Sequence, residues 1–217
     1  MTGDDDMVSN MSAEALPMDD GDRALPSWFV PPPEGWHADD LDRLPPEAPR
    51  HIELIDGALI VTAPQGSFHM RVINALLGLL GEQAPDGLEV AREITIKLGE
   101  RQRPEPDLLV LDSRILDEER AWVAPEDVHL VIEVVSPESE VRDTKRKPQL
   151  YAEAGIKHFW LVMNDGGQPV VHTYELDPGV GTYVATGIFH QTMTLMVPFP
   201  IRLEVDKLRQ WRRLKLS

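Results

Sequence analysis

Two apolar runs of strand length constrain the fold more than any other feature of the sequence. Residues 107–111 read DLLVL and residues 128–135 read VHLVIEVV, so nearly every side chain in them is apolar. Such runs are typical of central strands in a sheet that is covered on both faces. Glu133 interrupts the second run, and a carboxylate there needs a partner, a shifted pKa or a metal ion, because burying an isolated charge is costly.

A hairpin and a helix are expected before these runs. Residues 51–63 form two short β-runs around Asp56-Gly57, a dipeptide that suits a two-residue turn because both residues tolerate positive φ. Ser67 is a candidate N-cap, and apolar residues follow it at helical spacing until the pattern stops before Pro85. The sequence therefore predicts a β-hairpin and then an amphipathic helix.

A second helix and more strands are expected after the hairpin and first helix. We place the start of the second helix between Asp143 and Pro148 and its end at Gly155. Further β-structure is expected at residues 88–98, 157–163, 170–176, 182–188 and 194–205. The prediction is an α/β fold: a mixed β-sheet of seven to nine strands, flanked by helices.

The length of 217 residues, without an internal repeat or a membrane-spanning apolar run, predicts one domain and no membrane partner. Residues 1–25 are acidic and poor in apolar side chains, so we expect a disordered tail. Residues 26–217 would form the domain, with 26–50 as a wrapping segment that includes one short helix, and 206–217 as a basic C-terminal segment. With no signal peptide and no cysteine, the predicted location is the cytoplasm.

The formal net charge of −16 argues against broad adhesion to nucleic acid or to an anionic membrane. A polyanion site must then be local, made of clustered cations or of metal ions. One basic cluster follows Glu133, and we expect salt-sensitive binding if its residues Arg142, Lys145 and Arg146 contact phosphates. We expect the second basic cluster to be solvated surface and not a polyanion site. This C-terminal cluster consists of Lys207, Arg209, Arg212, Arg213 and Lys215.

Two acids share a setting in the predicted sheet. Asp107 stands at the mouth of the first apolar run and Glu133 lies within the second, so paired strands would bring both carboxylates to one edge of the sheet. Hard oxygen ligands of this kind suit Mg²⁺ or Mn²⁺. Such an ion polarises a phosphoryl oxygen and lowers the pKa of a bound water. At the sheet edge, the cation would also compensate the charge of Glu133.

A lysine that holds the water or the developing charge is expected just downstream. Lys145 and Lys147 are the candidates, and Tyr151 lies on the same face as Lys147 if one helix includes both. Pro148 disfavours helical backbone at Lys147.

Six segments follow one another along the chain: ELIDG (53–57), PQGSFH (64–69), PEPDLLV (104–110), IEVVSPES (132–139), DTKRKPQLYAEAGI (143–156) and HFWLV (158–162). Together and in this order, they resemble the Uma-type putative restriction endonuclease family, within the PD-(D/E)xK nuclease superfamily. The resemblance covers roughly residues 28 to 205.

The resemblance implies a restriction-endonuclease-like core in which Asp107 and Glu133 are the metal-binding acids, with the Val135 backbone carbonyl as a further ligand. Val135 also stands where the superfamily signature has a lysine, and Lys147 is the matching residue from the following helix. Glu53 matches the early glutamate of the family and would complete the metal shell or help a second ion. His69 matches the histidine that opens the first long helix of the family. Beside these matches, we expect His69, Tyr151, Arg142 and Lys145 to support the metal-binding residues or to contact the substrate.

Structural explanations of these residues stay open. Glu133 could pair with Arg142, and Asp107 could accept a turn hydrogen bond at the start of its strand. Lys147 could be solvated at a helix start. Glu53 could form an ion pair with Arg50 or Arg71, and His69 could pack or cap at its helix start. Tyr151 could be a packing residue, and Asp143 an N-cap. Lys145 or Arg146 could also take the catalytic place of Lys147.

The function expected from the residues and the resemblance together is a Mg²⁺- or Mn²⁺-dependent endonuclease that cleaves nucleic acid, with DNA and a homodimer suggested by family analogy. Its predicted catalytic residues are Asp107, Glu133, Lys147 and Glu53. The alternative is a nuclease-fold module with weak or no activity that binds a protein partner. The strong acidity and the missing lysine at Val135 favour that alternative.

Overall fold

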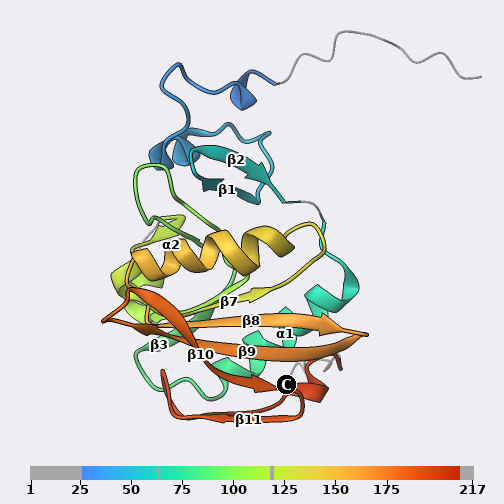
Figure 1. Ribbon diagram of the computed structural model, residues 1–217. Helices are drawn as coiled ribbons and strands as arrows, with labels where there is room; N and C mark the ends of the chain where they lie inside the picture. Colours follow the sequence, from blue (N-terminus) through green and yellow to red (C-terminus); the bar gives the residue numbers. More distant parts are fainter. Residues whose placement is uncertain (1–25, 63, 118–119, 211–217) are drawn as a thin grey trace, which may run out of the picture.

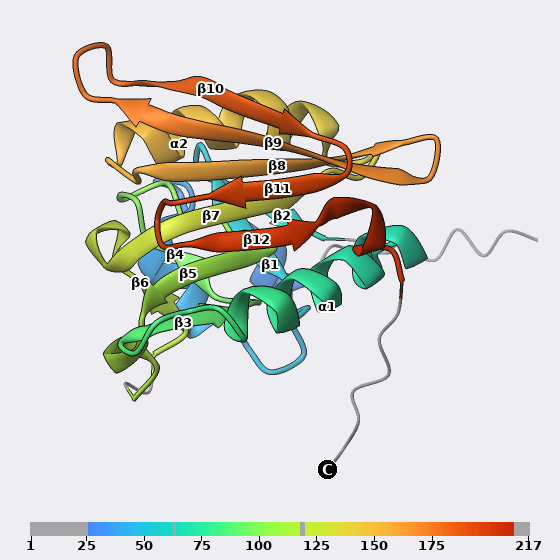
Figure 2. The ribbon, with the colours of Figure 1, turned by 90° about the horizontal axis from the view of Figure 1, so that it is seen from below.

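A six-stranded mixed sheet forms the centre of the molecule, with strand order β10-β9-β8-β7-β5-β3 (Figures 1 and 2). This computed structural model describes residues 26–62, 64–117 and 120–210, so the expected disordered tail lies outside the described residues. The β7–β8 pair is parallel, and the other neighbouring pairs in this sheet are antiparallel. The strands are β3 (Leu88–Ala91), β5 (Leu108–Asp112), β7 (Val128–Val134), β8 (His158–Asp165), β9 (Gln168–Asp177) and β10 (Thr182–Phe189).

Three two-stranded sheets lie outside this sheet in the described part of the chain. These are β1 (Ile52–Ile55) with β2 (Ala58–Val61), β4 (Thr95–Ile96) with β6 (Trp122–Val123), and β11 (Thr192–Leu195) with β12 (Ile201–Glu204). The prediction of seven to nine strands in one sheet was therefore wrong. Pro198 and Pro200 lack an N–H for a strand ladder, and residues 194–205 fold back on themselves instead of forming one outer strand.

The predicted hairpin and first helix are both present. Asp56 and Gly57 have φ of 53° and 77°, which is the turn that joins β1 to β2. Helix α1 (Ser67–Gly81) begins one residue after its cap, which is Gly66 and not Ser67. The 3₁₀-helices are η1 (Ser27–Phe29), η2 (Ala38–Arg43), η3 (Ser113–Asp117), η4 (Pro125–Asp127) and η6 (Val205–Lys207).

The second helical segment begins earlier than predicted and in an unusual form. Residues Arg142–Arg146 form a π-helix, η5, and α2 (Lys147–Glu153) continues from it. Lys147 is helical, with φ of −59° and ψ of −45°, although Pro148 follows it. Gly155 has φ of +80° directly after the helix ends, as expected of a residue that terminates a helix.

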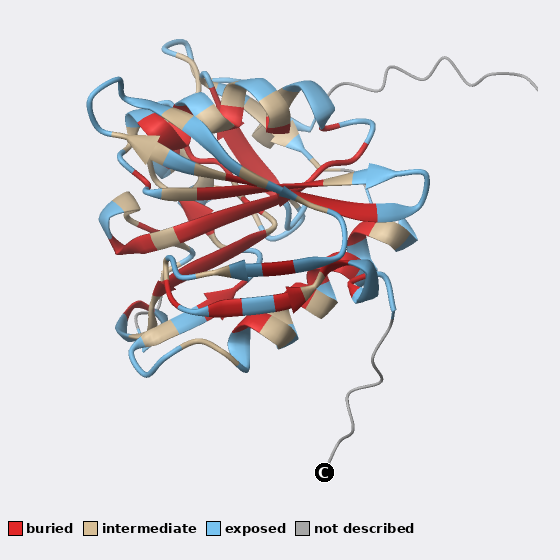
Figure 3. Ribbon diagram, turned by 60° about the horizontal axis from the view of Figure 1, so that its bottom comes forward, coloured by how far each residue is buried: buried red, intermediate tan, exposed pale blue. Residues whose placement is uncertain are grey.

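Alternation along the central strands creates two apolar layers, and the middle of the sheet is buried (Figure 3). Helix α1 and the β11–β12 hairpin cover one face, which includes Leu108, Val110, Leu130, Ile132 and Val134. The other face packs beneath α2 and includes Leu109, Leu111, Val131, Val135 and Phe159. No helix in the described ranges is long and apolar enough to cross a membrane.

Candidate active site

Asp107 and Glu133 lie on the same face of the sheet, beneath α2. The antiparallel register pairs Leu108 with Ile132, and continuing it by one residue sets Asp107 opposite Glu133. Asp107 lies two residues before Leu109 and Glu133 two residues after Val131, so both acids point to the face that packs against α2. β7 is an interior strand and Glu133 is 1% exposed, so the expectation that Glu133 emerges at the sheet edge was wrong.

Asp107 is held through one of its two oxygens. The Val134 N–H donates to Asp107 Oδ2 over 2.7 Å, and His69 Nε2 donates to the same oxygen over 3.0 Å. His69 is buried in the first turn of α1, so the helix reaches the carboxylate directly. Asp107 Oδ1 accepts no hydrogen bond from the described part of the chain.

Glu133 is also held through only one of its two oxygens in the described residues. The Tyr151 hydroxyl donates to Glu133 Oε1 over 2.7 Å, and Lys147 Nζ lies 3.1 Å from that oxygen. Within the described ranges, Glu133 Oε2 accepts no hydrogen bond. Burial raises the pKa of Glu133 well above its ordinary value, because the nearby Lys147 charge only partly offsets the loss of hydration.

Lys147 contacts three carboxyl groups, which form a buried cluster around it, and it is itself almost fully buried. Besides Glu133, its ammonium group contacts Glu53 Oε2 at 3.0 Å and Asp143 Oδ1 at 3.5 Å. It also donates to the Glu105 carbonyl over 3.4 Å. Burial lowers the pKa of Lys147, but the surrounding carboxylates outweigh burial and raise it above its ordinary value. Lys147 therefore stays cationic at neutral pH.

Glu53 and Asp143 complete the buried cluster. Arg142 Nε lies 2.8 Å from Glu53 Oε1, so Arg142 pairs with Glu53 and not with Glu133. Within the described residues, Glu53 pairs with Arg142 and Lys147 and not with the expected Arg50 or Arg71, because it faces inward from β1. Burial raises the pKa of Asp143, with Lys147 as the main opposing charge.

Asp143 lies inside the π-helix, so it is not the N-cap that its sequence position suggested. Its role in the cluster was missed from the sequence. The signal was its spacing, because an acid four residues before a lysine on a helical segment can form an ion pair with it.

The donor set of this cluster fits a small divalent cation. Asp107, Glu133, Glu53 and Asp143 are four carboxyl groups, and Lys147 and Arg142 are two cations, so the acidic groups outnumber the basic ones. No group of three or more His, Cys, Asp or Glu side chains in the described residues has metal-binding spacing. Two carboxylates suffice for Mg²⁺, which keeps several water ligands and demands few from the protein.

The backbone carbonyl that could join these acids is that of Val134. The Val135 N–H donates to the Val162 carbonyl of β8 over 2.9 Å, which turns the Val135 backbone away from Asp107. The Val134 N–H faces Asp107, and in an extended strand the N–H and C=O of one residue point to the same side. The geometry therefore replaces Val135 with Val134 as the candidate ligand.

Two of the three cations that we expected to contact phosphates are in ion pairs. Arg142 pairs with Glu53, and Arg146 Nε donates to Asp56 Oδ2 over 2.8 Å. Lys145 is exposed on the π-helix. Of the C-terminal basic cluster, Arg212, Arg213 and Lys215 lie outside the described residues.

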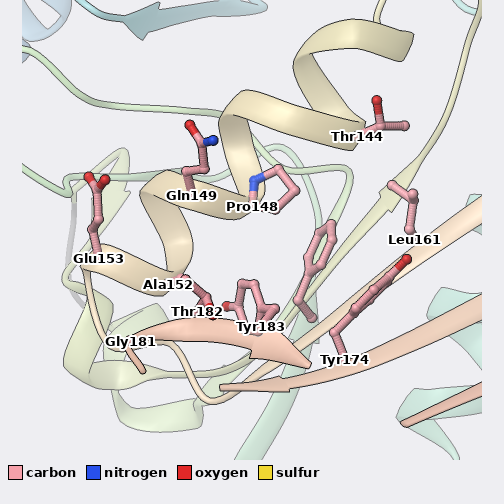
Figure 4. Close-up of a pocket in the computed structure, with 11 residues that line it drawn as sticks. Thr144, Pro148, Gln149, Ala152, Glu153, Leu161, Tyr174, Gly181, Thr182 and Tyr183 are labelled. Carbon is pink, nitrogen blue, oxygen red and sulfur yellow. The ribbon is translucent and has the colours of Figure 1, made fainter. Parts of the chain in front are cut away.

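A cavity of about 290 Å³ lies between α2 and the strands β8, β9 and β10 (Figure 4). The helix residues Pro148 and Ala152 line it, together with the aromatic rings of Phe159, Tyr174 and Tyr183. None of the clustered acids lines this cavity, so it is separate from the candidate active site.

The comparisons with known proteins agree with this fold. One solved structure, a putative nuclease belonging to DUF820 from Anabaena variabilis ATCC 29413, has a TM-score of 0.60 and 22% identity. The match covers 80% of this chain and 97% of that chain, and at this identity it bears on the fold alone. No protein of curated function matches the sequence.

The family model of Uma2, described as "Putative restriction endonuclease", matches residues 38–207. This match spans far more than half of the chain and contains all four predicted catalytic residues. The α/β fold class is confirmed by the mixed sheet and by the structural neighbour. The protein therefore belongs to the Uma2 family of putative restriction endonucleases, as the resemblance of its six segments predicted.

Proposed function

We propose that this protein is a divalent-metal-dependent endonuclease that hydrolyses phosphodiester bonds of DNA. One observation carries the proposal: Asp107 and Glu133 share one face of the sheet, and each keeps a carboxylate oxygen free of hydrogen bonds from the described chain. The buried Lys147 ammonium lies 3.1 Å from Glu133. Membership of a family described as "Putative restriction endonuclease" supports DNA as the substrate, although a fold alone does not fix a substrate.

Asp107, Glu133 and the Val134 carbonyl are the groups that would hold Mg²⁺ or Mn²⁺. When bound, the ion would polarise a phosphoryl oxygen and lower the pKa of a water ligand. His69 and the Val134 N–H fix the orientation of Asp107, and the Tyr151 hydroxyl fixes that of Glu133. Because these hydrogen bonds hold one oxygen of each acid, the other oxygen keeps a fixed orientation.

Lys147 would act as a charged hydrogen-bond donor and not as a base. Its raised pKa keeps it protonated through the neutral range. A fixed ammonium group beside the metal-binding acids can stabilise negative charge that develops on the phosphate. Lys145, which is exposed on the same helical segment, is the cation available to contact the DNA backbone.

The test is cleavage of plasmid, linear duplex and single-stranded DNA, with RNA in parallel, in Mg²⁺ or Mn²⁺ and in EDTA. Asp107→Ala and Glu133→Ala should each abolish metal-dependent cleavage. Asp112→Ala is the matched control, because Asp112 lies at the opposite end of β5 and contacts His129 and Arg114. Cleavage that survives both active-site changes, or RNA cleavage without DNA cleavage, would contradict the proposal.

A second candidate function is a nuclease-fold module that binds a protein partner without hydrolysis. The observations that favour it are the formal net charge of −16 and the ion pairing of Arg142 and Arg146, which leaves few cations for a duplex. This module predicts no cleavage of any nucleic acid in either metal. A wild-type protein that cleaves DNA and loses cleavage in both alanine variants excludes it.

A further inference from the structure

Glu53 differs from the other acids of the cluster in how its oxygens are used. Oε1 lies 2.8 Å from Arg142 Nε, in an ion pair without the alignment of a hydrogen bond. Oε2 accepts from the Glu105 N–H over 3.2 Å and lies 3.0 Å from Lys147 Nζ. Both oxygens therefore face cations of the chain itself, whereas Asp107 and Glu133 each keep one oxygen free of hydrogen bonds from the described residues.

The π-helix explains how two residues five apart in sequence reach one carboxylate. The Lys147 N–H donates to the Arg142 carbonyl, which is the i to i+5 hydrogen bond of a π-turn. In an α-helix, residues five apart would point about 140° away from each other, since each residue turns the helix by about 100°. The wider π-turn brings Arg142 and Lys147 to the same side, where Glu53 meets both.

The β1–β2 hairpin contacts the π-helix at a second point. Asp56, in the turn of the hairpin, pairs with Arg146 at the last residue of the π-helix. Glu53 is almost fully buried and Arg142 is largely buried, whereas the Asp56 carboxylate is 52% exposed. Exposed ion pairs contribute little to stability, so the buried contact at Glu53 should dominate.

We infer that Glu53 is a positioning residue, which holds Lys147 against Glu133 through the π-turn, and is not a ligand of the metal ion. This inference rests on the proposed function and revises the expectation that Glu53 completes the metal shell. With Glu53 neutral, Arg142 would lose its buried counter-charge and the π-turn would loosen. Lys147 would then lie less firmly beside Glu133.

The test compares Glu53→Gln, which keeps the shape of the side chain, with Asp56→Asn as the matched control on the same hairpin. We expect Glu53→Gln to lower kcat by about tenfold or more, with KM and the Mn²⁺ affinity from calorimetry each within about threefold of wild type. Asp56→Asn should leave all three within about twofold. A fall in Mn²⁺ affinity of about tenfold, or recovery of kcat at high Mn²⁺, would overturn the inference, because Glu53 would then act on metal binding and not on the position of Lys147.

A double-mutant cycle tests whether Glu53 acts through Lys147. In a Lys147→Met background, Glu53→Gln should lower kcat by less than about twofold, because the group it positions is gone. An undiminished effect in that background would overturn the inference. If Glu53→Gln does not fold, Arg142→Gln tests the same contact from its other side and should lower kcat with the Mn²⁺ affinity unchanged; an unchanged kcat would count against the inference.

Amide hydrogen exchange separates failure of this inference from failure of the proposed function. A wild-type protein without cleavage would end the nuclease proposal, yet exchange in residues 142–147 can still be measured. Glu53→Gln should speed exchange in that segment, and Asp56→Asn should not. Unchanged exchange in Glu53→Gln would overturn the positioning role whether or not the protein cleaves DNA.

Discussion

Glu133 is a carboxylate on an interior strand, and its neighbours explain how the fold tolerates it. Lys147 and Tyr151 contact the same oxygen of Glu133, so one cation and one hydroxyl replace part of the lost hydration. The pKa of Glu133 is nevertheless raised by burial, with contributions from Asp143 and Asp107. Its ionised form therefore costs free energy in the folded, metal-free protein.

This cost leads to a prediction for Glu133→Gln. A carboxyl whose folded pKa lies above its ordinary value near 4.5 destabilises the fold increasingly as the pH rises above that value. In EDTA at pH 7 to 8, the variant should unfold about 2–4 °C or more above wild type, the shift expected from about 1 kcal/mol in a domain of this size. Calorimetric melting checks this. Mn²⁺ should then raise the Tm of wild type only, and a lower Tm of the variant in EDTA would contradict the argument.

Tyr151→Phe tests the hydroxyl that orients Glu133. A buried hydrogen bond to a charged group contributes about 1.5–3 kcal/mol, so the free energy of unfolding should fall by that amount. Tyr183→Phe is the control, since the Tyr183 hydroxyl donates to the neutral Ile156 carbonyl and its loss should cost about 1 kcal/mol. Urea denaturation measures both variants. Equal losses would indicate that Glu133 accepts the bond as a neutral carboxylic acid.

At the residue scale, the sequence predicted the acids better than their surroundings. The expected pairing of the two apolar runs is present and sets Asp107 and Glu133 side by side, on one face of the sheet. The direction of the Val135 backbone could not be predicted, because only the structure shows that the Val135 N–H donates to the Val162 carbonyl of β8. Lys147 is helical in spite of Pro148, since its ion pairs with Glu53, Glu133 and Asp143 outweigh a local backbone preference.

Among the elements, the N-terminal segment contacts the core through a buried arginine, Arg103. Arg103 donates from Nε to Thr95 Oγ1 over 2.8 Å, from Nη1 to the Ala38 carbonyl over 2.8 Å and from Nη2 to Asp42 over 2.7 Å. Its backbone also bridges to Leu54 of β1. Arg103 thus connects η2 to β4 through its side chain and contacts the β1–β2 hairpin through its backbone.

Arg103→Met should therefore loosen the whole N-terminal segment. Removing one partner of a buried ion pair lowers the free energy of unfolding by about 3–5 kcal/mol. Because Asp42 is 40% exposed, we expect a decrease near the lower end of this range. Limited proteolysis should then cut within residues 26–50 much faster than in wild type. Arg43→Met is the control, because Arg43 is 76% exposed in its pair with Asp40. Equal resistance of both variants would show that η2 is held by other contacts.

The elements were predictable where local chemistry decides them. Asp56-Gly57 encodes its own turn, and α1 follows from helical spacing of apolar residues. The π-helix was not predictable, because its extra residue per turn is stabilised by contacts from a hairpin about 90 positions earlier in the chain. The grouping of strands into one six-stranded sheet and three pairs depends equally on distant partners.

For the whole molecule, the central question is how a chain with a formal net charge of −16 could bind DNA. The net charge opposes association with a polyanion, so attraction must come from a few local cations and from a metal ion. Ion pairs with Glu53 and Asp56 occupy Arg142 and Arg146, and Lys145 remains exposed beside the site. This distribution predicts binding that depends strongly on the divalent ion and only weakly on monovalent salt.

The salt dependence of DNA binding measures how many cations contact phosphates. With Ca²⁺ in place of Mg²⁺ to prevent cleavage, fluorescence anisotropy of a labelled duplex should give a slope of log K against log salt between about −1 and −2. Three phosphate contacts by Arg142, Lys145 and Arg146 would instead give about −2.7, at about 0.9 per contact. Lys145→Gln should make the slope shallower by about 0.9, whereas Arg146→Gln should leave it unchanged, because Asp56 already neutralises that guanidinium. A slope steeper than about −2.7 that Arg146→Gln reduces would show that this arginine leaves Asp56 to bind DNA.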